Sequence, residues 1–458
     1  MLPPDFLTRL TQLLGQTEAD KLCNALTQTE PPVSIRLNPL RPAPILPAES
    51  GNKVPWCTEG VFLKTRPKFT YDPLLHAGTY YVQEAASMFV EQAWKQICCD
   101  FTPARLLDLC AAPGGKSTLW RSLMPTGTLL VANEPIRQRA QILAENLTKW
   151  GHPDVVTTSA YPDEFSSLGS FFDVIAADVP CSGEGMFRKD QTAIDEWSAE
   201  AVSNCAARQW DIIQQVWPAL RQGGYLVYST CTYNREENED NVARICHELG
   251  AEPVAIDTLP EWNIAGDTTG RNLPVYHFFP HRTQGEGLFL ALLRKTAEAP
   301  VAKEKKNKKR ATVNRTPAAK GAAKINSWIA DSNEFKFLRP TDSHLLAVRQ
   351  SLADHIQHVC SCVNALTAGV LVAEEKGNKL IPQHALALSS ILAPEAFPHV
   401  ELPLEQALAY LRREALQLET STPKGYIVLT FKGFALGFAN NLGTRANNLY
   451  PQEWRIRN

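Results

Sequence analysis

Short apolar runs alternate with helical patterns from about residue 104 to residue 296, and this alternation limits the fold more than any other feature of the chain. The runs cover residues 105–109, 127–133, 172–177 and 224–229, and helical patterns lie between them, for instance over 136–149 and 201–220. This pattern is typical of an α/β domain with a doubly wound, mostly parallel sheet. A late run at 287–293 predicts a further strand, antiparallel and at an edge of the sheet.

The first of these runs leads into a glycine-containing turn and then into a helical pattern. Ligands of open α/β sheets bind at the carboxyl ends of the strands, where such a turn lets the backbone approach closely. The sequence Gly115-Lys116-Ser117 is also typical of a phosphate-binding P-loop. That motif requires a glycine five residues before Gly115, and position 110 is a cysteine. A nucleotide-hydrolysing protein is therefore the weaker hypothesis.

The second run ends in Asn133-Glu134, which predicts an acidic side chain at the tip of a strand. An acid in that position can accept hydrogen bonds from the two hydroxyl groups of a ribose, as in dinucleotide-binding folds. An acid that follows a strand also commonly caps the next helix. The position next to the glycine-containing turn favours the ribose interpretation, with capping as the alternative.

Two further strand ends place two cysteines and an acid at the same edge of the sheet. Segment 177–185 contains Asp178 and Cys181, and segment 229–238 contains Cys231. Carbon 5 of cytosine attacks a methyl donor only after a thiolate has added to carbon 6. A carboxyl group such as Asp178 suits hydrogen bonding to the ring nitrogen, and a base must then remove the carbon-5 proton so that the thiol can leave. The target base must also be extruded from any stack of bases.

Eight of the 11 cysteines in the chain favour the ordinary interpretation of a small buried side chain: Cys23, Cys57, Cys98, Cys99, Cys205, Cys246, Cys360 and Cys362. No C-x-x-C pair occurs, so no metal site is expected. The net charge of −2 does not by itself indicate nucleic-acid binding. The sequence shows no secretory signal and no apolar run near the roughly 20 residues of a membrane span. We therefore expect a cytoplasmic protein with reduced thiols and no membrane contact, and nothing requires more than a monomer.

With these motifs the chain resembles the Sun family of RNA cytosine-5 methyltransferases over roughly residues 30–296. The matching segments are D-L-C-A-A-P-G-G-K at 108–116, N-E at 133–134, D-V-P-C-S-G-E-G at 178–185 and S-T-C-T at 229–232. The resemblance implies a Rossmann-like domain that uses S-adenosylmethionine, with Cys231 as nucleophile and Cys181 assisting product release. Segments at 185–190, 280–287 and 447–451 resemble a bacterial branch that acts on small-subunit ribosomal RNA. Transfer RNA is the alternative substrate.

The resemblance also implies which residues bind the cofactor. These are Cys110, Ala111, Ala112, Pro113, Gly114, Gly115, Lys116, Glu134, Arg139 and Asp178. Lys116 has an alternative interpretation as a solvated lysine at the start of a helix. Arg36 and Asn38 match an R-x-N element that supports the site in the family. An aspartate that contacts adenine in many relatives has no counterpart that we would assign within 157–163.

Four segments are expected along the chain: an N-terminal RNA-binding region over 1–95, the methyltransferase domain over 96–296, a basic linker over 297–325 and a C-terminal RNA-binding region over 326–458. The resemblance implies an RNA-recognition-like fold in the first and a PUA-like module from about residue 380 in the last. Residues 302–324 hold nine Lys or Arg against one acid, Glu304, which is typical of a solvated tether or of an RNA-contacting arm. The expected partner is RNA, and a non-catalytic RNA-binding assembly factor is a further alternative.

Overall fold

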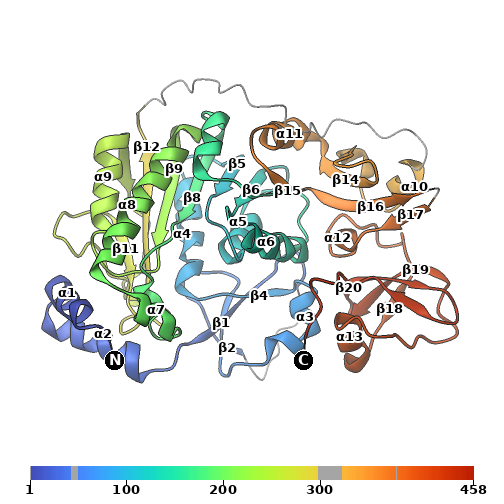
Figure 1. Cartoon of the computed structure of the whole chain (residues 1–458), viewed down its shortest axis with the longest axis horizontal. Coiled ribbons are helices and arrows are strands. Elements are labelled where there is room, and N and C mark those ends of the chain that lie inside the picture. Colours follow the sequence, from blue (N-terminus) through green and yellow to red (C-terminus); the bar gives the residue numbers. More distant parts are fainter. Residues whose placement is uncertain (1, 43–49, 298–321, 378, 458) are drawn as a thin grey trace.

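The computed structural model of the chain describes residues 2–42, 50–297, 322–377 and 379–457. A long central sheet has the strand order β10-β12-β9-β8-β5-β6-β7-β15, and β11 also pairs with β12 (Figure 1). Its strands are β5 Arg105–Asp108, β6 Leu129–Asn133, β7 Val155–Thr158, β8 Phe172–Asp178, β9 Leu220–Thr230, β10 Ala251–Val254, β11 Val275–Phe278, β12 Leu288–Lys295 and β15 Ala365–Ala368. Most of the predicted basic linker lies outside the described residues.

The neighbouring strands β9, β8, β5, β6 and β7 run parallel, and the predicted runs coincide with strands of this group. The carboxyl ends of β5, β6, β8 and β9 therefore meet at one edge. Strand β12 is antiparallel to β9, as predicted. Its predicted edge position is wrong, because β11 pairs with its first half, 288–291, and β10 pairs with its second half, 292–295.

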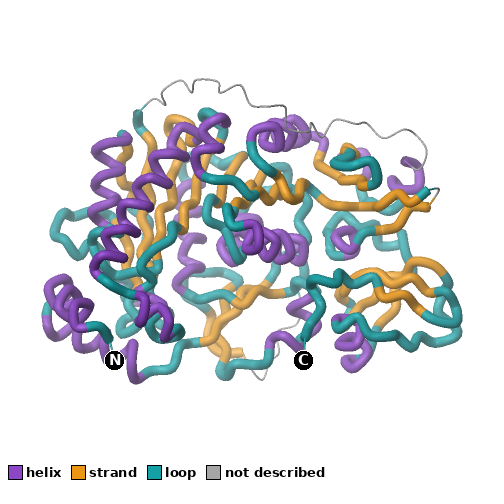
Figure 2. Tube along the Cα trace, in the orientation of Figure 1, coloured by secondary structure: helices purple, strands orange, loops and turns teal. Residues whose placement is uncertain are grey.

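Alternate residues of β5 point to opposite faces of the sheet, and each face has its own helices. Leu106 belongs to the core formed with α4 (Val90–Cys98), α5 (Gly115–Leu123) and α6 (Arg137–Trp150). Leu107 belongs to the core formed with α8 (Ala199–Val216), α9 (Glu239–Leu249) and the 3-10 helix Pro162–Leu168. Helices on both faces of a mostly parallel sheet make the doubly wound, Rossmann-like fold that was predicted (Figure 2). No helix in the described ranges has the length and apolar character needed to span a bilayer.

The N-terminal region consists of a helical pair and a small antiparallel sheet of order β2-β3-β1-β4. The helical pair packs against the loops that follow β8 and β9, where Phe6 meets Phe187 and Trp197 edge-on. This contact joins the start of the chain to the segments that contain the candidate cysteines. The elements are α1 Pro4–Leu14, α2 Gln16–Gln28, β1 Val33–Leu37, β2 Ser50–Lys53, β3 Gly60–Leu63, α3 Pro73–His76 and β4 Tyr80–Val82, and α7 Gln191–Glu196 follows β8.

The C-terminal region packs directly on the central domain, because its strand β15 extends the central sheet antiparallel to β7. Nearby, Arg349 Nε lies 3.0 Å from both carboxylate oxygens of the buried Asp154. Two further sheets have the orders β13-β14-β16-β17 and β18-β19-β20-β21. The elements are α10 Ala322–Asn326, β13 Phe335–Leu338, β14 His344–Arg349, α11 Ala353–Cys362, β16 Val370–Lys376, β17 Lys379–Pro382, α12 His384–Ala387, β18 His399–Glu401, α13 Leu404–Leu411, β19 Gly425–Phe431, β20 Phe434–Asn441 and β21 Ala446–Asn448.

Candidate active site

The predicted cofactor turn joins β5 to α5 at the carboxyl edge of the central sheet. Neighbouring elements hold its backbone through the hydrogen bonds Ala111 N–H to Asn133 O (2.8 Å), Arg139 Nη2 to Ala112 O (3.2 Å) and Asn146 Nδ2 to Pro113 O (2.8 Å). Gly114 has φ 118°, in the left-handed region that favours glycine. A Cβ at Gly114 would lie 3.3 Å from Leu143, so the turn lies tightly against α6.

Three acidic side chains surround this turn. Asp108 ends β5, Glu134 follows β6 and Asp178 ends β8. Burial raises the pKa of the Cys110 thiol, and the nearby carboxylates of Asp178, Asp108 and Glu134 raise it further. Carboxylates therefore surround the turn and can accept hydrogen bonds from a ligand.

Asp108 is the most deeply buried of the three acids. Its Oδ2 accepts a hydrogen bond from Ser117 Oγ at 2.6 Å. Burial raises the pKa of Asp108 to about 7; the Ser117 bond opposes this shift, and the neighbouring Asp178 adds to it. Near neutral pH, Asp108 is therefore balanced between its neutral and charged forms.

Lys116 and Asp178 form an ion pair between the first turn of α5 and the end of β8. Lys116 Nζ lies 2.8 Å from Asp178 Oδ2, and Ser229 Oγ donates to Asp178 Oδ1 at 2.7 Å. Burial by itself lowers the pKa of Lys116, but the charge and the hydrogen bond of the Asp178 carboxylate, together with the charge of Asp108, raise this pKa above its usual value. The Lys116 side chain is only 16% exposed, so its interpretation as a solvated lysine is wrong.

Glu134 and Arg139 lie together beside the cofactor turn. Glu134 Oε1 accepts the backbone N–H of Ile136 at 3.0 Å, a bond in the turn before α6 and not to an N–H group of the helix itself. Glu134 Oε2 lies 3.3 Å from Arg139 Nη1, whose side chain is about half exposed. Because Arg139 also contacts the carbonyl of Ala112, both predicted residues border the same side of the turn.

Cys181 and Cys231 are brought together from the ends of the adjacent strands β8 and β9. Their Sγ atoms are 3.0 Å apart, and the backbone N–H of Cys231 donates to Cys181 Sγ at 3.3 Å. Both are free and partly exposed. The hydrogen bond with Cys231 and burial hold the pKa of Cys181 well above its usual range. Cys181 is therefore a neutral thiol at physiological pH.

The loops that follow the two cysteines touch each other at Gly185, and Gly287, directly before β12, packs against both of them. Gly185 N–H donates to Cys231 O at 2.8 Å. A Cβ at Gly287 would lie 2.6 Å from the Tyr233 hydroxyl and 2.7 Å from Gly185 Cα. Only a residue without a side chain leaves room for this approach.

Arg36 of the N-terminal region reaches the start of α5 and thereby supports the cofactor turn. Its guanidinium is fully buried and lies 4.5 Å from the ring of Trp150. Nε donates to Gln83 Oε1 at 2.8 Å, and Nη2 donates to Thr118 Oγ1 at 2.5 Å. Asn38 Nδ2 donates to the carbonyl of Trp150 at 3.1 Å. The R-x-N element thus joins the N-terminal region to α5 and α6.

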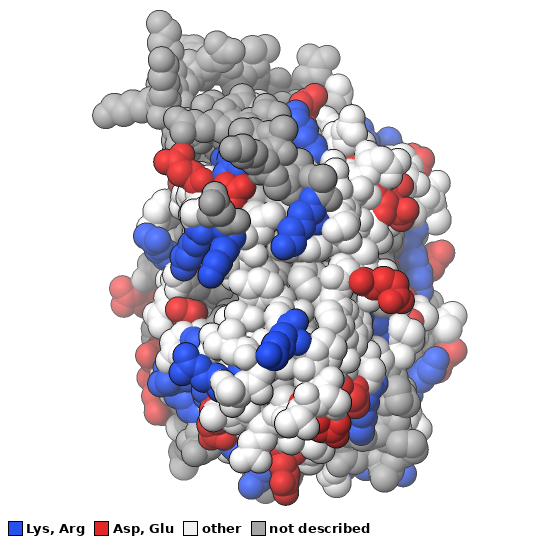
Figure 3. All heavy atoms as spheres, turned by 90° about the vertical axis from the view of Figure 1, so that its right-hand side faces the viewer, with Lys and Arg blue, Asp and Glu red and all other residues white. Residues whose placement is uncertain are grey.

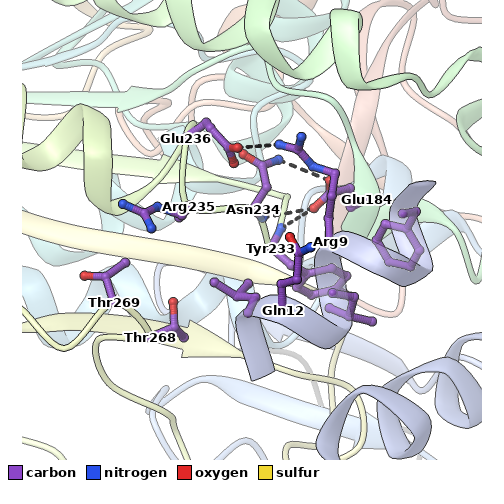
Figure 4. Close-up of a pocket in the computed structure, with 12 residues that line it drawn as sticks. Arg9, Gln12, Glu184, Tyr233, Asn234, Arg235, Glu236, Thr268 and Thr269 are labelled. Carbon is purple, nitrogen blue, oxygen red and sulfur yellow. Dashed lines mark hydrogen bonds and ion pairs between the residues drawn. The ribbon is translucent and has the colours of Figure 1, made fainter. Parts of the chain in front are cut away.

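A cavity of about 270 Å³ lies behind the loop that follows Cys231, between that loop and α1 (Figure 4). Arg9 of α1 points toward Glu236 and forms an ion pair with it. The cavity wall includes Glu184, a buried acid three residues after Cys181. Sequence reasoning assigned no role to Glu184 or to the equally buried Glu237, although each acid lies close to a cysteine in the chain.

Three family models match the chain. Their descriptions are 16S rRNA methyltransferase RsmB/F over residues 102–294, N-terminal domain of 16S rRNA methyltransferase RsmF over 2–85 and methyltransferase RsmF PUA domain over 397–456. A relative named ribosomal RNA small subunit methyltransferase F, from Enterobacter sp. (strain 638), is 32% identical and covers 87% of this chain and 83% of its own length. The chain belongs to the RsmB/F family of 16S rRNA methyltransferases.

The similarity to RsmB/F-family proteins extends over nearly the whole chain. A relative of the same name from Escherichia coli O157:H7 is 31% identical over 98% of this chain and 96% of its own. A methyltransferase homolog from Pyrococcus horikoshii has a TM-score of 0.52 at 25% identity, covering 63% of this chain and 94% of its own. NSun6 from the same organism has a TM-score of 0.54 at 20% identity, covering 65% and 99%.

Membership of the RsmB/F family confirms several expectations from the sequence. The chain is a methyltransferase that acts on RNA, and S-adenosylmethionine is its cofactor. The PUA module in the C-terminal region is confirmed over residues 397–456. The roles assigned to individual side chains stay predictions.

Proposed function

We propose that this protein methylates carbon 5 of a cytosine in small-subunit ribosomal RNA, with Cys231 as the covalent nucleophile. The observation that supports this most is the pair of thiols 3.0 Å apart at the ends of two adjacent parallel strands. The Lys116–Asp178 ion pair lies at the same carboxyl edge of the sheet. The names of the relatives from Enterobacter and Escherichia support small-subunit ribosomal RNA over transfer RNA as substrate.

S-adenosylmethionine fits this turn because its positive sulfonium and ammonium groups can interact with the surrounding carboxylates. Residues 110–116 would contact its methionine part, and the tight turn at Gly114 would let the backbone approach it. Glu134 would accept hydrogen bonds from the ribose, with Arg139 and Asp178 completing the site. When bound, the cofactor supplies an electrophilic methyl group.

Cys231 starts the reaction by adding its sulfur to carbon 6 of the flipped cytosine, which makes carbon 5 nucleophilic. The Lys116–Asp178 pair would supply a hydrogen bond to the ring nitrogen, where negative charge develops. The attack is assigned to Cys231 because it stands in the T-C motif of the Sun family, and Cys181 Sγ, 3.0 Å away, is the second thiol at the site.

Cys181 would assist the release of the product. Once the sulfur of Cys231 is bonded to carbon 6, the hydrogen bond that raises the pKa of Cys181 is weakened. Cys181 can then release its proton to solvent and, as a thiolate, accept the proton from carbon 5. Loss of this proton re-forms the double bond between carbons 5 and 6 and expels the sulfur of Cys231.

The flanking regions, 1–95 and 326–458, would bind RNA around the target. The basic side chains Lys432, Arg445, Arg455 and Arg457 of the C-terminal module are all exposed and could contact phosphates. Figure 3 shows Lys and Arg on this end of the molecule, separated by uncharged surface and by acids. Such spacing suits discrete contacts with individual phosphates. The protein would act as a cytoplasmic monomer.

The test supplies the purified protein with labelled S-adenosylmethionine and, in parallel, unmodified small subunits, naked ribosomal RNA and transfer RNA. We expect 5-methylcytosine mainly in the small-subunit samples. Cys231→Ala should abolish transfer and keep cofactor binding, and Cys181→Ala should accumulate a protein–RNA adduct on a denaturing gel. If 5-methylcytosine appears mainly in transfer RNA, the proposal that small-subunit ribosomal RNA is the substrate is refuted. An adduct formed by Cys231→Ala would refute the assignment of Cys231 as the nucleophile.

A further inference from the structure

We propose that Glu184 and Glu237 are positioning residues that hold the two active-site thiols in contact. Each acid belongs to the loop of one cysteine and accepts backbone hydrogen bonds from the loop of the other. The effect on methylation rests on the proposed function, whereas the effect on the distance between the thiols does not.

Glu184 lies three residues after Cys181 and reaches into the loop of Cys231. Its Oε2 accepts the backbone N–H groups of Tyr233 at 2.8 Å and of Asn234 at 3.0 Å (Figure 4). Its Oε1 accepts Trp197 Nε1 at 3.0 Å. The side chain is 2% exposed, so these bonds are shielded from water.

Glu237 lies six residues after Cys231 and reaches in the opposite direction, into the loop of Cys181. Its Oε2 accepts the backbone N–H of Ser182 at 3.0 Å and Gln209 Nε2 at 2.6 Å. The same Gln209 nitrogen donates to the carbonyl of Pro180 at 2.9 Å. Glu237 therefore holds the residues on both sides of Cys181.

Asn234 joins the two acids. Its Nδ2 lies 3.2 Å from Glu184 Oε1 and 2.7 Å from Glu237 Oε1. We call Glu184, Asn234 and Glu237 the loop-bridging network. Because the network spans both loops in both directions, a shift of either cysteine would break bonds at two carboxylates.

Stability alone does not account for this arrangement. Buried carboxylates carry a large desolvation cost, and apolar side chains of similar size are often at least as stabilising. Burial indeed raises the pKa of Glu237, while the bonds from Ser182 and Asn234 oppose that shift. Directional bonds instead fix geometry, which the proposed reaction needs because carbons 5 and 6 of one cytosine must face two different sulfurs.

The first experiment measures the thiol–thiol distance without RNA or cofactor. Phenylarsine oxide bridges two adjacent thiols: two arsenic–sulfur bonds form, and the oxygen leaves as water with the two thiol protons. The variants are Glu184→Gln and Glu237→Gln, with Glu236→Gln as the matched control, because Glu236 pairs with Arg9 outside the network. Peptide mass mapping identifies the bridged pair, and Cys181→Ser sets the background.

We expect the wild type and Glu236→Gln to be bridged between Cys181 and Cys231 with equal affinity. Glu184→Gln and Glu237→Gln should bind the arsenical across this pair about tenfold more weakly, since small misplacements of paired groups have large effects on effective concentration. Both variants keep one acceptor oxygen at the mutated position, and thermal unfolding reports whether each is folded. Unchanged bridging in the two folded variants, or a loss that only follows unfolding, would overturn the proposal.

The second experiment measures methylation and adduct in single turnover. The network variants should methylate about 10–100-fold more slowly than Glu236→Gln and accumulate more adduct, because Cys181 no longer faces carbon 5. If arsenical bridging depends on the network but the wild type methylates no RNA, the positioning role of the network is supported and the proposed function is refuted. Wild-type rates and adduct levels in both variants would refute a role of the network in catalysis.

Discussion

Replacing Arg36 by methionine tests whether the N-terminal region holds the cofactor turn in place. Methionine retains part of the aliphatic length of arginine and removes the guanidinium. The substitution removes the bonds to Gln83 and Thr118 and the contact with the ring of Trp150. Thr118 lies in α5, the helix that follows the turn. Losing the bond between Arg36 and Thr118 should therefore loosen the start of α5 and weaken cofactor binding.

The expected loss of stability follows from opposing contributions. Two hydrogen bonds from a charged group contribute about 1.5–3 kcal/mol each, and the ring contact adds about 1–2 kcal/mol. Burial lowers the pKa of Arg36 from 12.5 to about 10, so removing the charge recovers about 3.5 kcal/mol at about 1.4 kcal/mol per pH unit. The free energy of unfolding should therefore fall by about 0.5–4.5 kcal/mol.

The assay combines denaturant unfolding with titration of S-adenosylmethionine. Arg41→Met is the matched control, since Arg41 is a partly buried arginine of the same region whose bonds to described residues go to the carbonyls of Ala77 and Lys149. Both variants should lose stability, but only Arg36→Met should bind the cofactor more weakly. Equal affinities in the two variants, or a change in unfolding free energy below about 0.5 kcal/mol for Arg36→Met, would refute the reasoning.

Three further predictions concern the site itself. The fold raises the pKa of Asp108 from 3.8 to about 7 and so favours its neutral form. The free energy of unfolding of the wild type, relative to that of Asp108→Asn, should therefore fall by up to about 4 kcal/mol as pH rises from 4 to 7. A difference between the two proteins that stays constant with pH in urea unfolding would contradict this. Gly287→Ala should lose about 1–3 kcal/mol in thermal unfolding through its clash with Tyr233, whereas Gly266→Ala, with open space around it, should not. Glu134→Gln should weaken cofactor binding about tenfold in calorimetry with little change in the rate at saturation; unchanged affinity would leave Glu134 only its bond to the N–H of Ile136.

The local patterns of the sequence were sufficient for the fold class and for the edge that holds the site. Strand and helix periods are short-range properties, and parallel strands necessarily align their carboxyl ends. For this reason the residues after β5, β6, β8 and β9 could be predicted to meet, and Cys181 and Cys231 indeed lie in contact. The glycine at position 114 is likewise explained by its own backbone angle.

Contacts between distant segments were decided only by the tertiary structure. The sequence left Lys116 open between a solvated and a bound side chain, and its partner Asp178 lies 62 residues further along the chain. The pairing of β15 with β7, the coverage of β12 by two short strands and the reach of Arg36 to α5 have no local signature. Glu184 and Glu237 resemble ordinary exposed acids in the sequence. Only the packing of two loops buries them, because a hydrogen-bond partner across 49 or 55 residues is set by the fold and not by neighbours in the chain.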